Sequence, residues 1–190
     1  MRDGMIVDMF GTGCFSLPAP DNPCVSFNIW ETLTDSALLS AIGQVLSSEA
    51  SRISCHVLAC HGETGLLAGI STFDHGGKPL LYVRNVGSDR PIEGFFKPKE
   101  KVLIIGSDVS DDGAWAIDMA DILRQAGLRV KDVLVLVDME RGAKEWLAEN
   151  DLKLHSHMTI SQVLETLVQT RQITEKESEQ SLQYIRNNQC

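Results

Sequence analysis

Acidic and hydroxyl side chains are concentrated in one short stretch, residues 106–113, which contains Asp108, Ser110, Asp111 and Asp112. Three carboxylates this close together form a set of hard oxygen ligands, the kind that a divalent cation such as Mg²⁺ prefers. Acidic residues are also favoured in the first turn of a helix, because the helix dipole attracts negative charge. The stretch therefore predicts either a metal site that includes Asp108 or an ordinary helix start.

Other reactive or aromatic side chains leave structural alternatives open. Cys60 stands beside His61, which suggests a ligand pair or a nucleophile, but the sequence offers no third partner and both residues also suit a structural role. Trp30 and Trp115 suit an aromatic pocket, but they also suit core packing or an interface. The five cysteines are an odd set with no CxxC pair, which favours reduced thiols over a disulfide framework or a zinc site.

The elements around the acidic stretch predict that it lies at an edge of a parallel sheet. Residues 102–105 are a continuous apolar run typical of a buried strand, and residues 133–137 are another. Between these runs, apolar residues recur at the spacing of one helix face, and Gly127 ends the helix. These residues are Trp115, Met119, Ile122, Leu123 and Ala126. A turn from a strand into a helix offers free backbone N–H groups to an anion. We therefore expect a ligand site at residues 106–113, with Gly113 just before the helix.

A second unit of the same kind precedes this one. A helical pattern covers residues 34–50, with Thr34 as its N-cap. The next segments are an apolar run at 55–60, the turn Gly62-Glu-Thr-Gly65, a helix at 66–73 and a strand at 80–83. A strand, a glycine-bearing turn, a helix and a strand form a βαβ unit, whose strands are parallel.

The two ends of the chain carry different signals. Pro18, Pro20 and Pro23 argue against a helix in the first thirty residues, where short extended pieces are expected near residues 5–7 and 25–29. Towards the other end, residues 153–157 suit an edge strand. Two capping boxes then begin two final helices, and they pair Thr159 with Gln162 and Thr174 with Glu177. Together the elements predict an α/β fold, a doubly wound parallel sheet in one domain of residues 1–190.

Charge and hydropathy narrow the functional class. The net charge of −9 argues against nucleic-acid binding, which normally needs clustered Lys and Arg. No apolar stretch approaches the ~20 residues that a membrane helix requires. Asp3 and Asp8 flank a short apolar run near the N-terminus, so that the apolar core of a secretory signal is missing. We expect a cytoplasmic protein that binds neither nucleic acid nor membrane.

The acidic stretch resembles a known ligand-binding signature. The segment Leu103-Ile-Ile-Gly-Ser-Asp-Val-Ser-Asp-Asp-Gly-Ala-Trp115 is similar to the phosphoribosyl-pyrophosphate motif of the type I phosphoribosyltransferases. Further segments resemble orotate phosphoribosyltransferases in the same order: Pro79-Leu-Leu-Tyr-Val-Arg84, Ile92-Glu-Gly94, Val135-Leu-Val-Asp-Met-Glu-Arg-Gly142 and Leu152-Lys-Leu-His-Ser156. The resemblance covers nearly the whole chain and implies the type I phosphoribosyltransferase fold, with residues 1–33 as an N-terminal hood and residues 34–190 as the core and C-terminal helices.

The resemblance fails at most positions of the motif itself. The two acids of the family align with Ser107 and Asp108, and the phosphate-binding threonine aligns with Asp111. The small neighbour of that threonine aligns with Asp112, and the last hydroxyl residue aligns with Trp115. Only Asp108 and Gly113 keep the residue types of the family.

Outside the motif, the resemblance assigns a mixture of kept and lost residues. Arg84 matches the loop arginine, but the lysine after it becomes Asn85, and residues 86–90 form a shortened catalytic loop without lysine. Gly62 and Gly65 lie where the family binds pyrophosphate through its backbone, although a tight turn explains these glycines equally well. Asp138 remains, whereas the arginine that would contact the nucleotide product aligns with Met139.

The sequence therefore supports more than one function. The first is an orotate phosphoribosyltransferase-like protein of pyrimidine nucleotide metabolism that is inactive or strongly impaired and acts by ligand sensing or protein contacts. The second is an active enzyme with altered or partner-supplied residues. A metal-dependent interaction module is the third, because Asp108-x-Ser110-x-Asp112 is similar to a motif of metal-dependent adhesion domains. The resemblance implies a phosphorylated small ligand, with Mg²⁺ as a cofactor.

The resemblance also implies a homodimer. Apolar residues in the proline-rich N-terminal segment, namely Phe27, Ile29 and Trp30, agree with a dimer interface if the sheet core leaves them uncovered.

Overall fold

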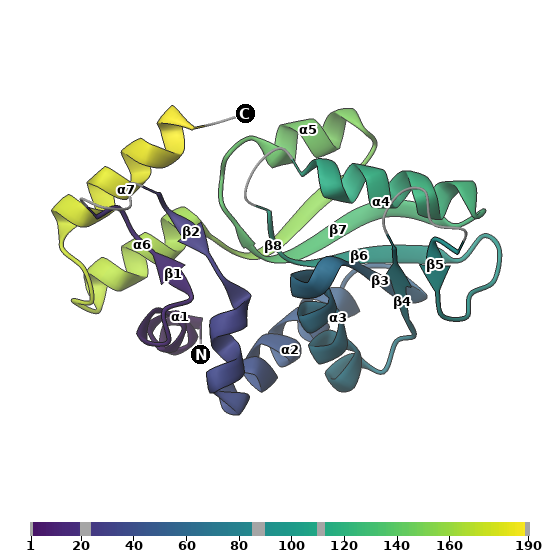
Figure 1. Cartoon of the computed structure of the whole chain (residues 1–190), viewed down its shortest axis with the longest axis horizontal. Helices are drawn as coiled ribbons and strands as arrows, with labels where there is room; N and C mark the ends of the chain where they lie inside the picture. Colours follow the sequence, from purple (N-terminus) through teal and green to yellow (C-terminus); the bar gives the residue numbers. More distant parts are fainter. Residues whose placement is uncertain (1, 20–23, 85–89, 110–112, 189–190) are drawn as a thin grey trace.

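The computed structural model of the protein describes residues 2–19, 24–84, 90–109 and 113–188. Its centre is a six-stranded sheet with the strand order β5-β4-β3-β6-β7-β8 (Figure 1). All neighbours are parallel except β4 and β5, which are antiparallel. The strands are β3 (Val57–His61), β4 (Leu80–Val83), β5 (Ile92–Glu93), β6 (Lys101–Val109), β7 (Arg129–Asp138) and β8 (Lys153–Thr159).

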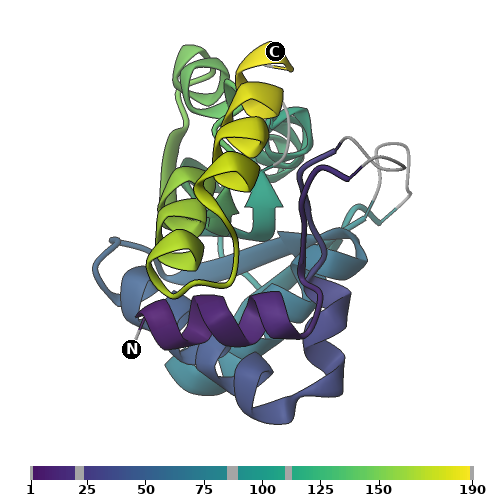
Figure 2. The same cartoon turned by 90° about the vertical axis from the view of Figure 1, so that its left-hand side faces the viewer.

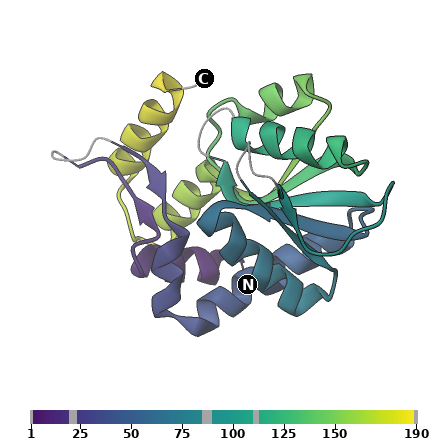
Figure 3. The same cartoon turned by 45° about the vertical axis from the view of Figure 1, so that its right-hand side comes forward.

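Helices cover both faces of this sheet, as a doubly wound fold requires (Figure 3). On one face lie α2 (Ser36–Ser51) and α3 (Gly62–Gly76), and on the other lie α4 (Ala114–Gln125) and α5 (Ala143–Glu149). Successive strand residues point to opposite faces, so Leu103 and Ile105 join one buried cluster while Val102 and Ile104 join the other. The predicted α/β fold class is confirmed.

The N-terminal segment corrects one prediction. Residues 2–11 form a helix, α1 (Arg2–Gly11), where short extended structure was expected. Met5, Ile6 and Met9 are buried on one side of α1, which contacts helix α6 (Ile160–Gln169). The helix can form because the prolines begin only at Pro18, beyond its end. The prediction was wrong because it applied the effect of these prolines to residues that precede them.

The remaining terminal elements lie beside α1 (Figure 2). Two short antiparallel strands, β1 (Phe15–Ser16) and β2 (Ser26–Phe27), bring the rings of Phe15 and Phe27 to 5.1 Å between centroids. A 3-10 helix, η1 (Ile29–Thr34), follows, and its residue Ile29 is buried. The C-terminal helices are α6 (Ile160–Gln169) and α7 (Glu175–Asn187). Their two predicted capping boxes are both present.

The start of α2 differs by one residue from the prediction. Asp35, not Thr34, is the N-cap, and its Oδ1 accepts hydrogen bonds from the backbone N–H groups of Ala37 and Leu38 at 2.9 and 3.1 Å. Thr34 still belongs to η1, where its hydroxyl donates to the carbonyl of Glu31 at 2.7 Å. Asp35 is therefore the N-cap, because the hydroxyl of Thr34 already forms a hydrogen bond within η1.

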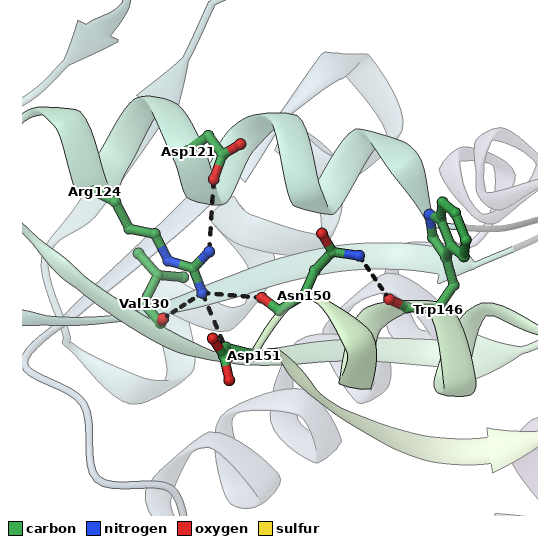
Figure 4. Close-up of polar contacts among 6 residues, drawn as sticks. All are labelled: Asp121, Arg124, Val130, Trp146, Asn150 and Asp151. Carbon is green, nitrogen blue, oxygen red and sulfur yellow. Dashed lines mark hydrogen bonds and ion pairs between the residues drawn. The ribbon is translucent and has the colours of Figure 1, made fainter.

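Helix α5 was not predicted from the sequence, and one arginine ties its end to the sheet (Figure 4). Nη2 of Arg124, on α4, donates to the backbone carbonyls of Val130, Asn150 and Asp151 at 3.1, 3.3 and 3.3 Å. Asn150 is the C-cap of α5, so the guanidinium satisfies carbonyls that a helix end leaves without partners. Among the described residues, no helix is both long and apolar enough to cross a membrane.

Candidate functional site

Two adjoining cavities lie where the carboxyl ends of β3, β4 and β6 meet the start of α4. The first has a volume of about 260 Å³ and is lined by residues that include Gly62, Gly65 and Asp108. The second, of about 310 Å³, is lined by residues that include Arg84. The structure thus brings together four predicted site residues from separate segments. The predicted residues Ser110, Asp111 and Asp112 lie outside the described residues.

The glycine segment after β3 is a helix start and not a separate turn. Helix α3 begins at Gly62, four residues earlier than predicted, and Gly62 adopts a positive φ of 65° that suits glycine. Gly65 is buried in the first turn, where an added Cβ would lie 3.7 Å from the carbonyl oxygen of Ile105. The first N–H groups of a helix have no partner within it, so this end of α3 offers donors to an anion.

Strand β6 is longer than predicted and carries the acidic residue into the first cavity. The strand continues to Val109 because it pairs with β7 as far as Asp138. Asp108 is half-buried, and its Oδ1 accepts a hydrogen bond from the hydroxyl of Ser107 at 2.7 Å. Gly113 is the N-cap of α4, with a φ of 72°. An added Cβ at Gly113 would lie 3.3 Å from both Leu147 and Val109. Both the positive φ and the close packing therefore favour glycine at this position.

Trp115 stands between the two cavities and lines both of them. It lies in the first turn of α4, and its ring covers Gly106 on β6, because an added Cβ at Gly106 would lie 2.7 Å from Cη2 of Trp115. The indole therefore fills space directly above the strand end. Trp30, in contrast, is 39% exposed in η1 and lines neither cavity, so the two tryptophans do not form a common aromatic pocket.

The cationic residue of the second cavity has an acidic partner. Nε of Arg84 lies 3.2 Å from Oε1 of Glu93, and this ion pair joins the end of β4 to β5. Both side chains are exposed, at 52% and 37%. A phosphate that approached Arg84 would have to compete with Glu93 for the guanidinium, although an exposed pair of this kind is weak.

Cys60 and His61 have separate surroundings. Burial raises the pKa of the Cys60 thiol to about 12, and its Sγ donates to the carbonyl of Leu81 at 3.6 Å. A thiol with so high a pKa is not a nucleophile, and the structural interpretation holds for this residue. The Nδ1–H of His61 donates to the carbonyl of Val83 at 2.7 Å, and the ring lines both cavities. His61 is the last residue of the buried strand β3, and ligands bind at the carboxyl ends of parallel strands. This position could have identified His61 as a site residue from the sequence.

Asp138 and Met139 do not face these cavities. Asp138 is 8% exposed at the end of β7, and its Oδ1 accepts the backbone N–H of Glu140 at 2.8 Å. Burial raises the pKa of Asp138. Met139 is 1% exposed and belongs to the core, so the side chain in the position of the family arginine points away from solvent.

A divalent cation finds few ligands in the described part of the chain. Those residues contain no group of three His, Cys, Asp or Glu side chains that could hold a metal ion. Asp108 is the carboxylate that lines the first cavity. Mg²⁺ is commonly held by one or two carboxylates together with the phosphates of a substrate. The described residues therefore fit a Mg²⁺ ion shared with a phosphate ligand, and they do not fit a cage made by the protein alone.

Comparison with known proteins gives several orotate phosphoribosyltransferases and UMP synthases as relatives. The chain is 30% identical to orotate phosphoribosyltransferase of Halobacterium salinarum over 136 residues, which cover 70% of this chain and 76% of that protein. It is 36% identical to uridine 5′-monophosphate synthase of Bos taurus over 105 residues, which cover 55% of this chain and 22% of that protein. The solved UMP synthase of Leishmania donovani has a TM-score of 0.87 at 19% identity, over 97% of this chain and 42% of that one. No protein-family model matches the sequence.

These similarities carry different weight. The L. donovani structure, at 19% identity, shows a shared fold alone, and this is the type I phosphoribosyltransferase fold that the sequence predicted. The chain spans less than half of the length of both UMP synthases. The H. salinarum enzyme is matched over most of its length at 30% identity, and that alignment carries the assignment. The chain belongs to the orotate phosphoribosyltransferase family.

Proposed function

We propose that this protein acts in pyrimidine nucleotide metabolism as an inactive or strongly impaired member of its family, which binds a phosphorylated ligand for sensing or for protein contacts. The observation that carries the proposal is Trp115, whose indole covers Gly106 between the two cavities. The resemblance places a small hydroxyl residue of the phosphate-binding motif at this position. An indole there lacks the hydroxyl group of the family residue and occupies space that a phosphate would need.

Charge at neighbouring positions adds to this steric argument. The sequence places Asp111 where the family has a threonine that contacts the phosphate. A carboxylate about 4 Å from a phosphate charge costs about 4 kcal/mol at an effective dielectric constant of ~20, which corresponds to roughly a thousandfold in affinity. A shared Mg²⁺ would offset part of this cost. Residues 86–90 also lack the loop lysine, which in the family would stabilise the departing pyrophosphate.

Residual ligand binding is supported by the groups that remain. The free N–H groups at the start of α3 and the carboxylate of Asp108 line the same cavity. Backbone donors at a helix start bind phosphate without any particular side chain, and Asp108 would share a Mg²⁺ ion with it. These groups position a phosphate ligand, but they do not replace the loop lysine that would stabilise the departing pyrophosphate.

The test compares binding with turnover. Calorimetric titration with phosphoribosyl pyrophosphate and Mg²⁺, beside an assay of orotidine monophosphate formation, should show weak binding and no turnover in the natural sequence. Turnover of even 1% of a typical ~10 s⁻¹ enzyme would contradict the expectation of no turnover, and turnover near the full rate would contradict the proposal as a whole.

A double variant locates the defect. Asp111→Thr with Trp115→Ser removes one repulsive carboxylate and the indole, so we expect tighter binding of phosphoribosyl pyrophosphate but still no turnover, because the loop lysine is absent. Trp146→Ser is the matched control, since Trp146 is a 47% exposed tryptophan on α5 that lines neither cavity. Restored turnover in the double variant would show that the rest of the active site is intact.

A homodimer is the oligomeric state that we propose. The apolar residues on which the prediction relied behave differently: Ile29 is buried and Phe27 packs on the core, whereas Trp30 is 39% exposed. Beside Trp30 in η1 lies Leu33, and the contacting helix α3 exposes Ile70 and Phe73. These four side chains support an interface better than the original three. An active enzyme that takes residues from a second subunit stays the alternative function.

A further inference from the structure

Three neighbouring strands begin with a cationic residue, at the edge of the sheet opposite to the candidate site. Strand β6 begins at Lys101, β7 at Arg129 and β8 at Lys153. These strands are adjacent and parallel, so their amino ends lie along one edge (Figure 1). At a strand rise of about 3.3 Å per residue, Lys101 lies roughly 23 Å along β6 from Asp108. Positive charge thus gathers far from the candidate site in a chain whose net charge is −9.

A cavity of about 320 Å³ opens at this edge. It is lined by Ser54, Lys101, Val102, Arg129, Lys131 and Asp132. Its volume lies at the lower end of the range of small-molecule sites, which is about 300–1,000 Å³. The cavity therefore has room for a small ligand, and most of its polar lining is cationic.

An irregularity in the sheet brings the β7 side chains together in this cavity. Lys101 pairs with Arg129, but Leu103 pairs with Asp132, so β7 contains one residue more than β6 over the same length. In a regular strand, residues 129 and 132 would point to opposite faces. The extra residue lets Arg129, Lys131 and Asp132 all line one cavity. Bulges of this kind often re-aim side chains beside functional sites.

The charges at this edge are not balanced within the described part of the chain. Among those residues, neither Arg129 nor Lys131 forms an ion pair, and Lys101 donates its Nζ–H to the hydroxyl of Ser54 at 3.0 Å. The one acid of the lining, Asp132, already accepts a hydrogen bond from Nε2 of His155 at 2.8 Å. Lys101 and Arg129 occupy paired positions on adjacent strands, where like charges repel each other. An anion in the cavity would relieve this repulsion.

We infer that this edge of the sheet is a second anion site, which binds a polyvalent phosphate group. A guanidinium donates two parallel hydrogen bonds to a phosphate, while the ammonium groups of Lys101 and Lys131 act as point charges around it. The hydroxyl of Ser54 supplies a further polar contact. Three cations around one small cavity match a diphosphate better than a single carboxylate. The inference does not depend on the proposed function, because it concerns the opposite edge of the sheet.

The direct test is an NMR titration of the full chain with inorganic pyrophosphate, without Mg²⁺ and at about 0.15 M salt, where surface charges are largely screened. We expect shifts of the backbone amides at residues 101 and 129–132. Amides of Gly62 and Gly65 report the candidate site separately, so the two sites are distinguished in one experiment. Shifts at Gly62 and Gly65 alone, or no shifts at all, would overturn the inference.

Charge variants separate a built site from general attraction. Arg129→Gln with Lys131→Gln should weaken pyrophosphate binding at this edge by about 10- to 100-fold, because each cation contributes a charged hydrogen bond. The thermal midpoint should stay or rise, since the repulsion between strands is relieved. Lys176→Gln with Arg186→Gln on α7 removes the same charge from exposed positions and should leave binding unchanged. Equal weakening in both variants would overturn the inference.

Two further arms define the ligand. Asp132→Asn removes the acid of the lining and should tighten pyrophosphate binding, whereas weaker binding would contradict an anion site. A nucleoside diphosphate is then compared with pyrophosphate. Equal affinities would identify the phosphate group alone as the ligand, and a tighter nucleoside diphosphate would add the nucleoside to it. Failure of both to bind, with capture of an acidic peptide instead, would overturn the small-ligand inference.

Discussion

Asp138 is a carboxylate that the fold buries at the end of β7, and its pKa is raised chiefly by desolvation. A raised pKa in the folded state means that folding favours the protonated form. The group therefore destabilises the fold as pH rises from 3.8, the ordinary pKa of an aspartate, through the raised folded pKa, and the full cost is present above it.

Substitution at this position should separate charge from hydrogen bonding. We expect Asp138→Asn to keep the acceptor for the N–H of Glu140, to lose this pH dependence and to be at least as stable as the natural sequence at neutral pH. Asp138→Ala should lose about 1–3 kcal/mol, because the backbone donor is left without its partner. Urea unfolding between pH 3 and pH 8, with flattened pH dependence in Asp138→Asn, is the measurement. An asparagine variant as unstable as the alanine variant would show that the charge itself is required.

The sequence could predict the site residues that lie near the carboxyl ends of strands. Gly62, Gly65, Arg84 and Asp108 all follow from the resemblance, and parallel strands bring them to one edge. The ring of Trp115 over Gly106 could not be foreseen, because it depends on how α4 packs across β6. The same limit applies to the Arg84–Glu93 pair, which requires the antiparallel edge strand β5.

Among the elements, α5 has the most specific attachment to the sheet, through Arg124 on α4. We expect Arg124→Ala to destabilise the fold by about 1–3 kcal/mol, because three carbonyls lose a charged donor. Arg124→Lys should lose less but not recover fully, since an ammonium cannot reproduce the planar fork of the guanidinium. Chemical denaturation of the three proteins measures the difference.

Arg52→Ala is the matched control, because Arg52 is 70% exposed and forms only a surface ion pair with Glu49 at 3.1 Å. Such a pair is worth about 0–1 kcal/mol. If Arg52→Ala and Arg124→Ala lose the same stability, the hydrogen bonds of Arg124 to the three carbonyls add nothing beyond a surface charge.

Elements with strong local signals were predicted well, and elements held by contacts distant in the sequence were predicted poorly. The strand Leu80–Val83 and the two C-terminal capping boxes depend on local residue types and were confirmed. Helix α5 has only seven residues, too few for a clear apolar stripe, and it is held by the distant Arg124. Helix α1 was missed because the prolines from Pro18 onwards were taken to exclude helix from the whole N-terminal segment, and its contact with α6 lies far along the chain.

For the whole molecule, the exposed group Trp30, Leu33, Ile70 and Phe73 predicts self-association. Light scattering at micromolar concentration should give a dimer, and Leu33→Asp with Ile70→Asp should give a folded monomer, because two charges would be buried without partners. Phe95→Asp is the control, since Phe95 is 80% exposed outside this group. A monomeric natural sequence, or dissociation by Phe95→Asp, would contradict this interface.

The contact between α1 and α6 sets an order of events during synthesis. Residues near position 6 must wait for residues near position 164 before Ile6 and Leu164 can share one buried cluster. While the chain emerges from the ribosome, α1 can pack against α2 early, but the part of α1 that contacts α6 stays uncovered until residues 160–169 have been made. We expect this helix to gain its full protection from proteases or chaperones only after the central sheet has formed.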